Sequence, residues 1–95
     1  MPVTRTLVTA VYSRSGITAK TDDETILRMA ESFDKVGQTK KSVEILEAGV
    51  SLKPQSGPLY LSLATYYQRL GNAQKATEME RKGRNLVQSS TQPGL

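Results

Sequence analysis

The chain has 95 residues, a formal charge of +4 and 37% hydrophobic residues, enough for one small domain. It contains no histidine, cysteine or tryptophan, so it lacks the usual ligands of zinc, haem and iron–sulfur clusters, the commonest general base and the cysteine nucleophile. We therefore predict no catalytic residue, no metal site and no cofactor. No apolar run approaches the roughly 18 residues of a transmembrane helix, so no membrane span is predicted.

Residues 1–22 form a predicted N-terminal arm that is rich in threonine and valine. The alternation of Val3, Leu7 and Val11 would suit an extended strand. Leu7, Val8 and Val11 would equally make the apolar stripe of a short helix. The structure of the arm stays open between these two alternatives.

A first helix is predicted from about residue 23 to residue 36. Thr21, Asp22 and Asp23 offer side-chain oxygens for its N-cap. Gly37 ends it, because glycine accepts the left-handed conformation of a helix C-terminus. Its apolar positions step by three and four residues, as in an amphipathic helix; they are Ile26, Met29, Ala30, Phe33 and Val36.

A second helix is predicted to follow, with Thr39 as its N-cap and with Pro54 and Gly57 as its stop signals. Its buried side is predicted to consist of Val43, Ile45, Leu46, Gly49, Val50 and Leu52. The short link at Gly37 favours an antiparallel pair of helices.

A third helix is predicted to begin at Pro58, whose missing N–H does no harm in a first turn, and to end at Gly71. Asn72 is a candidate N-cap for a fourth helix. Residues 88–95 are polar and contain proline and glycine, so we expect them to fray as a tail.

Eight positions recur at an offset of 34 residues and keep their chemical character. A fixed period of this length indicates a repeat architecture. The pairs are Ile26 and Tyr60, Met29 and Leu63, Ala30 and Ala64, Phe33 and Tyr67, Gly37 and Gly71, Ser42 and Ala76, Gly49 and Gly83, and Leu52 and Leu86.

Two helices per 34 residues, with these large and small residues at these places, resemble the tetratricopeptide repeat (TPR). The resemblance implies an all-α fold, a TPR-like α-solenoid of two antiparallel helix hairpins preceded by the N-terminal arm. We align one repeat with residues 23–56 and a second with residues 57–90, and treat residues 91–95 as a tail.

The second repeat departs from the first in a way that suits a chain end. Glu80 stands where the first repeat has Leu46, and Gln88 stands where the family pattern has a proline. Since the outer face of a terminal repeat meets water, we predict that the fourth helix is the C-terminal cap.

The resemblance also implies a concave binding surface lined by the first helix of each repeat. The lysine and asparagine with which some members hold a peptide's terminal carboxylate are missing at the matching positions, so we reject that ligand class. The alternative, that these are ordinary surface residues, stays open. The predicted partner-binding residues are Leu27, Glu31, Asp34, Lys35, Leu61, Thr65, Gln68 and Arg69, with Glu24 beside them.

The predicted function is a non-enzymatic adaptor or scaffold that holds a protein or peptide partner. Two repeats are fewer than the roughly three usually needed for a stable solenoid, so we expect a homo-oligomer or a subunit of a larger complex. The alternative is a helical-repeat protein that binds nucleic acid. We consider nucleic acid the less favoured partner, because the first helices carry at least as much acid as base.

Overall fold

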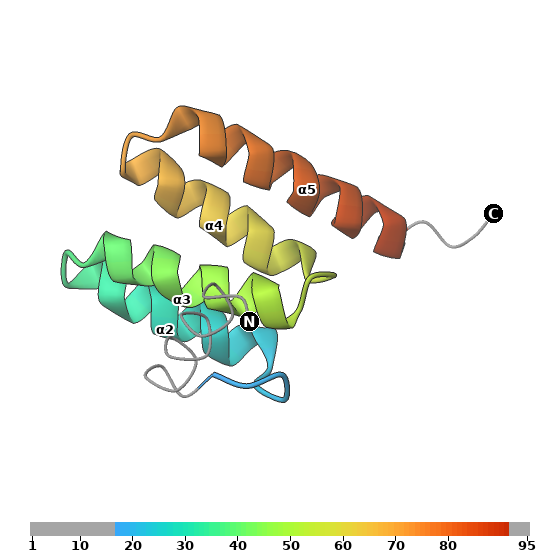
Figure 1. Ribbon diagram of the computed structural model, residues 1–95, viewed down its shortest axis with the longest axis horizontal. Coiled ribbons are helices and arrows are strands. Elements are labelled where there is room, and N and C mark those ends of the chain that lie inside the picture. The colour runs from blue at the N-terminus through green and yellow to red at the C-terminus, as the bar shows by residue number, and fades with distance from the viewer. Residues whose placement is uncertain (1–16, 92–95) are drawn as a thin grey trace, which may run out of the picture.

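The computed structural model describes residues 17–91, so the predictions for residues 1–16 and 92–95 lie outside it. Its helices are α2 (Asp23–Lys35), α3 (Thr39–Leu52), α4 (Gly57–Arg69) and α5 (Ala73–Thr91). Within that range there is no strand. Helices α2 and α3 pack as a first hairpin, α4 and α5 as a second, and α3 lies against α4 (Figure 1). The predicted all-α architecture of two stacked hairpins is confirmed.

Two of the predicted N-caps are confirmed and one is wrong. Asp22 caps α2, since its Oδ1 accepts the N–H of Thr25 at 3.1 Å. The Oδ1 of Asn72 accepts the N–H of Lys75 at 3.2 Å at the start of α5. Thr39 does not cap α3: it is the first helical residue, and its hydroxyl donates instead to Asp34.

The ends of α2 and α4 share one hydrogen-bonding pattern. Gly37 and Gly71 have φ of 81° and 83°, the left-handed region that glycine tolerates. The N–H of Gly37 donates to the carbonyl of Asp34 at 3.0 Å, and that of Gln38 to the carbonyl of Phe33 at 2.8 Å. Both bonds recur 34 residues later, from Gly71 to Gln68 at 3.0 Å and from Asn72 to Tyr67 at 2.9 Å. This is the Schellman motif, formed twice at the predicted period.

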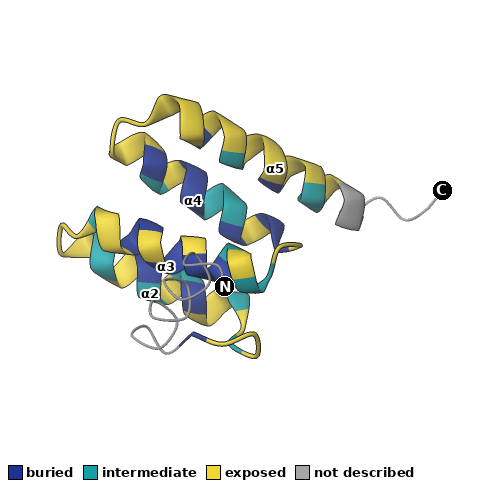
Figure 2. Ribbon diagram, viewed as in Figure 1, coloured by how far each residue is buried: buried dark blue, intermediate teal, exposed yellow. Residues whose placement is uncertain are grey.

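The core lies between the hairpins, where the facing sides of α3 and α4 are buried (Figure 2). Its most enclosed large side chains in the helices are Ile26, Leu46, Leu59 and Leu63. Ile17 precedes the first helix and is 2% exposed, so the arm contributes a core residue that its sequence did not reveal.

Small residues allow the helices to approach closely. A Cβ atom at Gly49 would lie 3.2 Å from side-chain carbons of both Ile26 and Leu59, so this glycine is a point where both hairpins meet. Ser42 is fully buried between α2 and α3, and its hydroxyl donates to the carbonyl of Ala30.

Two expectations for the helix ends are wrong. Gly57 does not stop α3: it opens α4, where a Cβ would lie 2.6 Å from Cγ2 of Val87 and 3.0 Å from the carbonyl oxygen of Gly83. The expected fraying from residue 88 is also wrong over residues 88–91, because α5 continues to Thr91.

Phe33 and Tyr67 occupy equivalent surroundings in the two hairpins. The ammonium of Lys41 lies 5.7 Å from the centre of the Phe33 ring, and that of Lys75 lies 5.5 Å from the centre of the Tyr67 ring. Tyr67 is the more buried of the two, and its hydroxyl donates to Glu47 on α3. That bond ties the second hairpin to the first.

Candidate functional site: the groove between α4 and α5

The structure separates the predicted partner-binding residues into two groups. Leu27, Glu31, Asp34 and Lys35 lie on α2, and Arg69 reaches them from the end of α4. Leu61, Thr65 and Gln68 lie instead on the side of α4 that faces α5. No residue of α2 lines the recess that these three residues border.

Within the α2 group, Asp34 is engaged by the protein itself. Its Oδ1 accepts the Thr39 hydroxyl at 2.7 Å, and its Oδ2 lies 3.1 Å from Nη1 of Arg69. Only 12% of its side chain is exposed. Glu31 and Lys35 are more exposed and lie 3.9 Å apart, while Leu27 is partly buried against the core. The open part of this group is therefore Glu31 and Lys35.

Tyr66 lies at the junction of the two hairpins. Burial raises the pKa of its hydroxyl, and the charges of Asp34 and Glu31 raise that pKa further, while Arg69 lowers it. The guanidinium of Arg69 lies 5.9 Å from the centre of the ring. Tyr66 therefore stays neutral at physiological pH and serves as a packing residue.

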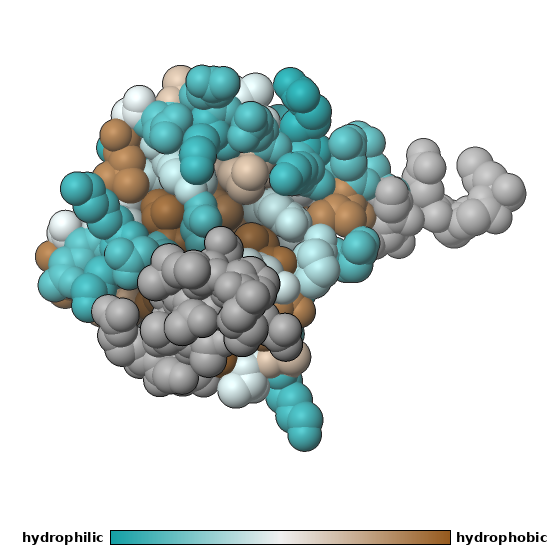
Figure 3. All heavy atoms as spheres, in the orientation of Figure 1, coloured by the Kyte–Doolittle hydropathy of each residue, from teal (hydrophilic) through white to brown (hydrophobic). Residues whose placement is uncertain are grey.

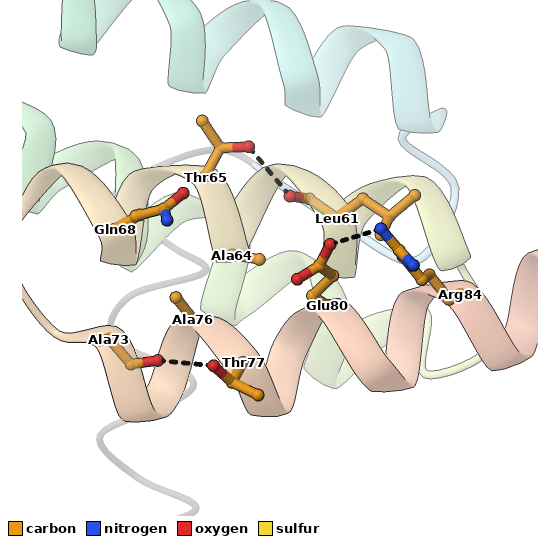
Figure 4. Close-up of a pocket in the computed structure, with 9 residues that line it drawn as sticks. All are labelled: Leu61, Ala64, Thr65, Gln68, Ala73, Ala76, Thr77, Glu80 and Arg84. Atoms are coloured by element: carbon orange, nitrogen blue, oxygen red, sulfur yellow. Dashed lines mark hydrogen bonds and ion pairs between the residues drawn. The ribbon is translucent and has the colours of Figure 1, made fainter.

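The second group lines a recess of about 370 Å³, which we call the α4–α5 groove. Figure 4 shows side chains from both helices along it. The lining residues are Leu61, Ala64, Thr65, Gln68, Ala73, Ala76, Thr77, Glu80 and Arg84. Ala64 and Ala76 are buried, and their small size leaves the space open.

Four polar side chains of the groove are bonded within their own helices. The hydroxyls of Thr65 and Thr77 donate to the carbonyls of Leu61 and Ala73, at 3.3 and 3.0 Å. Oε2 of Glu80 lies 2.8 Å from Nη2 of Arg84 (Figure 4). Both side chains of this ion pair are at least half exposed, so the pair is accessible to a partner.

The first hairpin has a surface equivalent to the α4–α5 groove, and another helix packs against it. The residues that precede the groove residues by 34 positions are Leu27, Ala30, Glu31, Asp34, Thr39, Ser42, Val43, Leu46 and Val50. Helix α4 packs beside this surface, with Leu59 over Gly49 and Arg69 paired to Asp34. The α4–α5 groove is thus the equivalent of the place that α4 occupies on the first hairpin.

At three positions of the α5 wall the groove is more polar than its counterpart, while Ala73 and Ala76 are less polar than Thr39 and Ser42. Thr77 replaces Val43, Glu80 replaces Leu46, and Arg84 replaces Val50. Leu46 is fully buried under α4, whereas Glu80 is exposed. Hydrophilic residues cover the α5 side of the molecule (Figure 3). These features are those of a terminal repeat.

The α5 residues of the groove were not among the predicted site residues. The prediction followed the concave face, which belongs to the first helices alone. The repeat period could have identified them, because the residues 34 positions after Val43, Leu46 and Val50 are Thr77, Glu80 and Arg84.

Neither a metal site nor a membrane span is found in residues 17–91. No group of three or more acidic residues lies close enough there to hold a metal ion. None of the four helices is both long enough and apolar enough to cross a bilayer.

No family model matches the chain, and no curated protein matches its sequence. The fold is similar to the solved structure named "MamA MSR-1 C2", a TPR-containing protein, with a TM-score of 0.68 over 90% of this chain and 18% sequence identity. The chain spans 47% of that protein's chain, about half of its length. The repeated capping pattern and this likeness together identify the fold as a TPR-like α-solenoid of two antiparallel helix hairpins.

Proposed function

We propose that the protein is a non-enzymatic interaction adaptor that holds a segment of a protein partner in the α4–α5 groove. It does so as a homo-oligomer or as a subunit of a larger assembly. The observation that carries the proposal is that the equivalent surface of the first hairpin is where the chain packs its own helix, α4.

The polar walls of the groove define the partner segment. Leu61, Ala64 and Ala76 favour contact with a small apolar side chain. Glu80 and Arg84 favour a segment that presents a cation and an anion about one helical turn apart, with the cation facing Glu80 and the anion facing Arg84. A fully apolar helix would bury this ion pair without compensating hydrogen bonds and is disfavoured.

Assembly is the second part of the proposal. Two hairpins bury a modest core, so a further subunit packed against the solenoid would add to it. The arm of residues 1–16 is the candidate linking segment. It would cover the first helix of its own chain, or it would lie against a neighbouring copy.

Photocrosslinking in cells tests the groove. We expect benzoylphenylalanine at Thr77, an exposed groove residue, to give a discrete protein adduct. The matched control is the same probe at Ser51, an exposed residue of α3 outside the groove. The adduct at Thr77 should be lost with Glu80→Lys. Equal adducts at both positions, or none at Thr77, would reject the groove as the binding surface.

Light scattering tests the assembly. Residues 1–16 should be deleted rather than residues 1–20, because Ile17 belongs to the core. We expect the full chain to have the mass of an oligomer and the shortened chain to have a lower mass. A monomeric full chain would reject self-association, and an unchanged oligomer would reject the arm as its link.

A further inference from the structure

The exposed large apolar side chains of residues 17–91 occur at two equivalent positions. Val36 is 68% exposed and Leu70 is 41% exposed. They are the C-cap residues of α2 and α4, each immediately before the glycine of a Schellman turn. Both turns lie at the same end of the molecule (Figure 1), where Figure 3 shows apolar patches among hydrophilic residues at the left edge.

A recess of about 400 Å³ lies beside Leu70 at this end, and we call it the turn-end recess. Leu70 forms one wall, and the turn and first residues of α3 form the other. The residues from that turn are Gly37, Gln38, Thr39, Lys40 and Lys41. None of the residues of this recess belongs to the α4–α5 groove, so the two surfaces are separate.

The recess carries positive charge that the described residues do not neutralise. Among the ion pairs of residues 17–91, none involves Lys40 or Lys41. Two nearby carboxylates are engaged elsewhere, since Asp34 pairs with Arg69 and Glu31 lies 3.9 Å from Lys35. Glu44, one helical turn after Lys40 on α3, forms no ion pair with either lysine. Lys41 lies over the ring of Phe33, which leaves its charge intact.

The geometry points to a second docking surface that takes an acidic peptide segment of a partner protein. One apolar side chain of the segment enters the recess against Leu70, and carboxylates on either side of it pair with Lys40 and Lys41. An anionic membrane has the matching charge, but a flat lipid surface would meet Val36 without filling the recess. The concave shape therefore favours a peptide.

The test uses the labelled full chain and a defined probe, the acetylated peptide Glu-Glu-Leu-Glu-Glu, followed by amide NMR shifts. We expect saturable shifts at Gly37 to Lys41 and at Leu70, and no comparable shifts along the α4–α5 groove. Binding should weaken about tenfold in the double variant Lys40→Gln and Lys41→Gln, because two exposed charge pairs are lost. Leu70→Ser should weaken it as well.

The controls separate this surface from general charge attraction. Arg81→Gln and Lys82→Gln remove two exposed cations of α5 and should leave the affinity unchanged. Equal weakening by that variant, equal binding of Lys-Lys-Leu-Lys-Lys, or shifts outside the recess would overturn the proposal. Binding to phosphatidylserine vesicles without any binding of the acidic peptide would also overturn it and would assign the surface to lipid.

Discussion

Arg69 on α4 lies 3.1 Å from Asp34 on α2, and this is the ion pair that joins the two hairpins among those formed by residues 17–91. Asp34 is largely enclosed and also accepts the Thr39 hydroxyl, whereas Arg69 is mostly exposed. One carboxylate thus links the first helix of each hairpin to the start of α3.

Asp34→Ala should lower the free energy of unfolding by about 1–2 kcal/mol, because it removes one hydrogen bond and one partly screened ion pair. Urea denaturation measures this loss. Glu31→Ala is the matched control on the same helix, since Glu31 is exposed and 3.9 Å from its partner, and it should change the stability by less than about 0.5 kcal/mol. Equal losses for the two variants would contradict the linking role of Asp34.

The pair Leu46 and Glu80 tests whether the second hairpin ends the solenoid. Leu46 is 0% exposed, so Leu46→Ala should cost about 2–5 kcal/mol through lost burial and a cavity. Glu80→Ala removes the equivalent residue from an open surface and should cost less than about 0.5 kcal/mol. Urea midpoints of the two variants give the comparison, and a large loss for Glu80→Ala would mean that another subunit covers that surface.

Gly83→Ala should destabilise the protein by about 1–3 kcal/mol, against the usual gain from replacing a glycine inside a helix. The reason is that a Cβ there would lie 2.7 Å from Cγ of Leu61 and 3.1 Å from the carbonyl oxygen of Gly57. Thermal unfolding measures the change. Asn85→Ala, an exposed change on the same helix, should be neutral or slightly stabilising, and the same outcome for Gly83→Ala would refute the close approach of α4 and α5.

The cap of α2 should depend on pH in a defined direction. Hydrogen bonds from the side chain of Thr25, and then from its backbone N–H, hold the pKa of Asp22 below its ordinary value of 3.8. A group whose pKa is lowered by folding stabilises the protein above its unfolded pKa and loses that effect as the pH falls through its folded pKa. The difference in melting temperature between the wild type and Asp22→Ala should therefore be full at neutral pH and shrink below pH 3.8.

A cap that does not titrate provides the control for that prediction. The Asn72 amide oxygen accepts the N–H of Lys75 at 3.2 Å, so Asn72→Ala removes a comparable bond at the start of α5. Its effect on the melting temperature should stay constant over the same pH range. If the effect of Asp22→Ala were equally constant, the carboxylate would not be the stabilising group.

Much of the fold could be predicted because helix starts and stops depend on neighbours in the sequence. Gly37 and Gly71 ended helices where predicted, since their left-handed backbone is a local requirement. The prediction that Thr39 caps α3 was wrong because its hydroxyl donates to the carboxylate of Asp34 on the preceding helix. Only the tertiary structure brings this acceptor close. Gly57 was misread for the same reason, because its lack of a side chain serves contact with Val87 and Gly83.

Three residues of the α4 wall of the groove were among the predicted site residues, and no residue of its α5 wall was. The repeat placed Leu61, Thr65 and Gln68 on one helix face, and these residues do line a groove. Its other wall comes from α5, whose polar composition predicted only solvent exposure. That composition does not reveal the equivalence of this face of α5 to the face of α3 that α4 covers. The charge and shape of that wall depend on how α5 packs against α4, and one close contact between them, Leu61 against Gly83, is visible only in the structure.

The shared interior of the two hairpins is tested most directly by nuclear Overhauser effects at Gly49. The side chains of Ile26 and Leu59 both lie close enough that a Cβ on this glycine would be 3.2 Å from each. We predict strong cross-peaks from a methyl group of each residue to the Gly49 Hα protons. Cross-peaks from Ile26 with none from Leu59 would mean that the hairpins fold side by side without a common core, which contradicts the account.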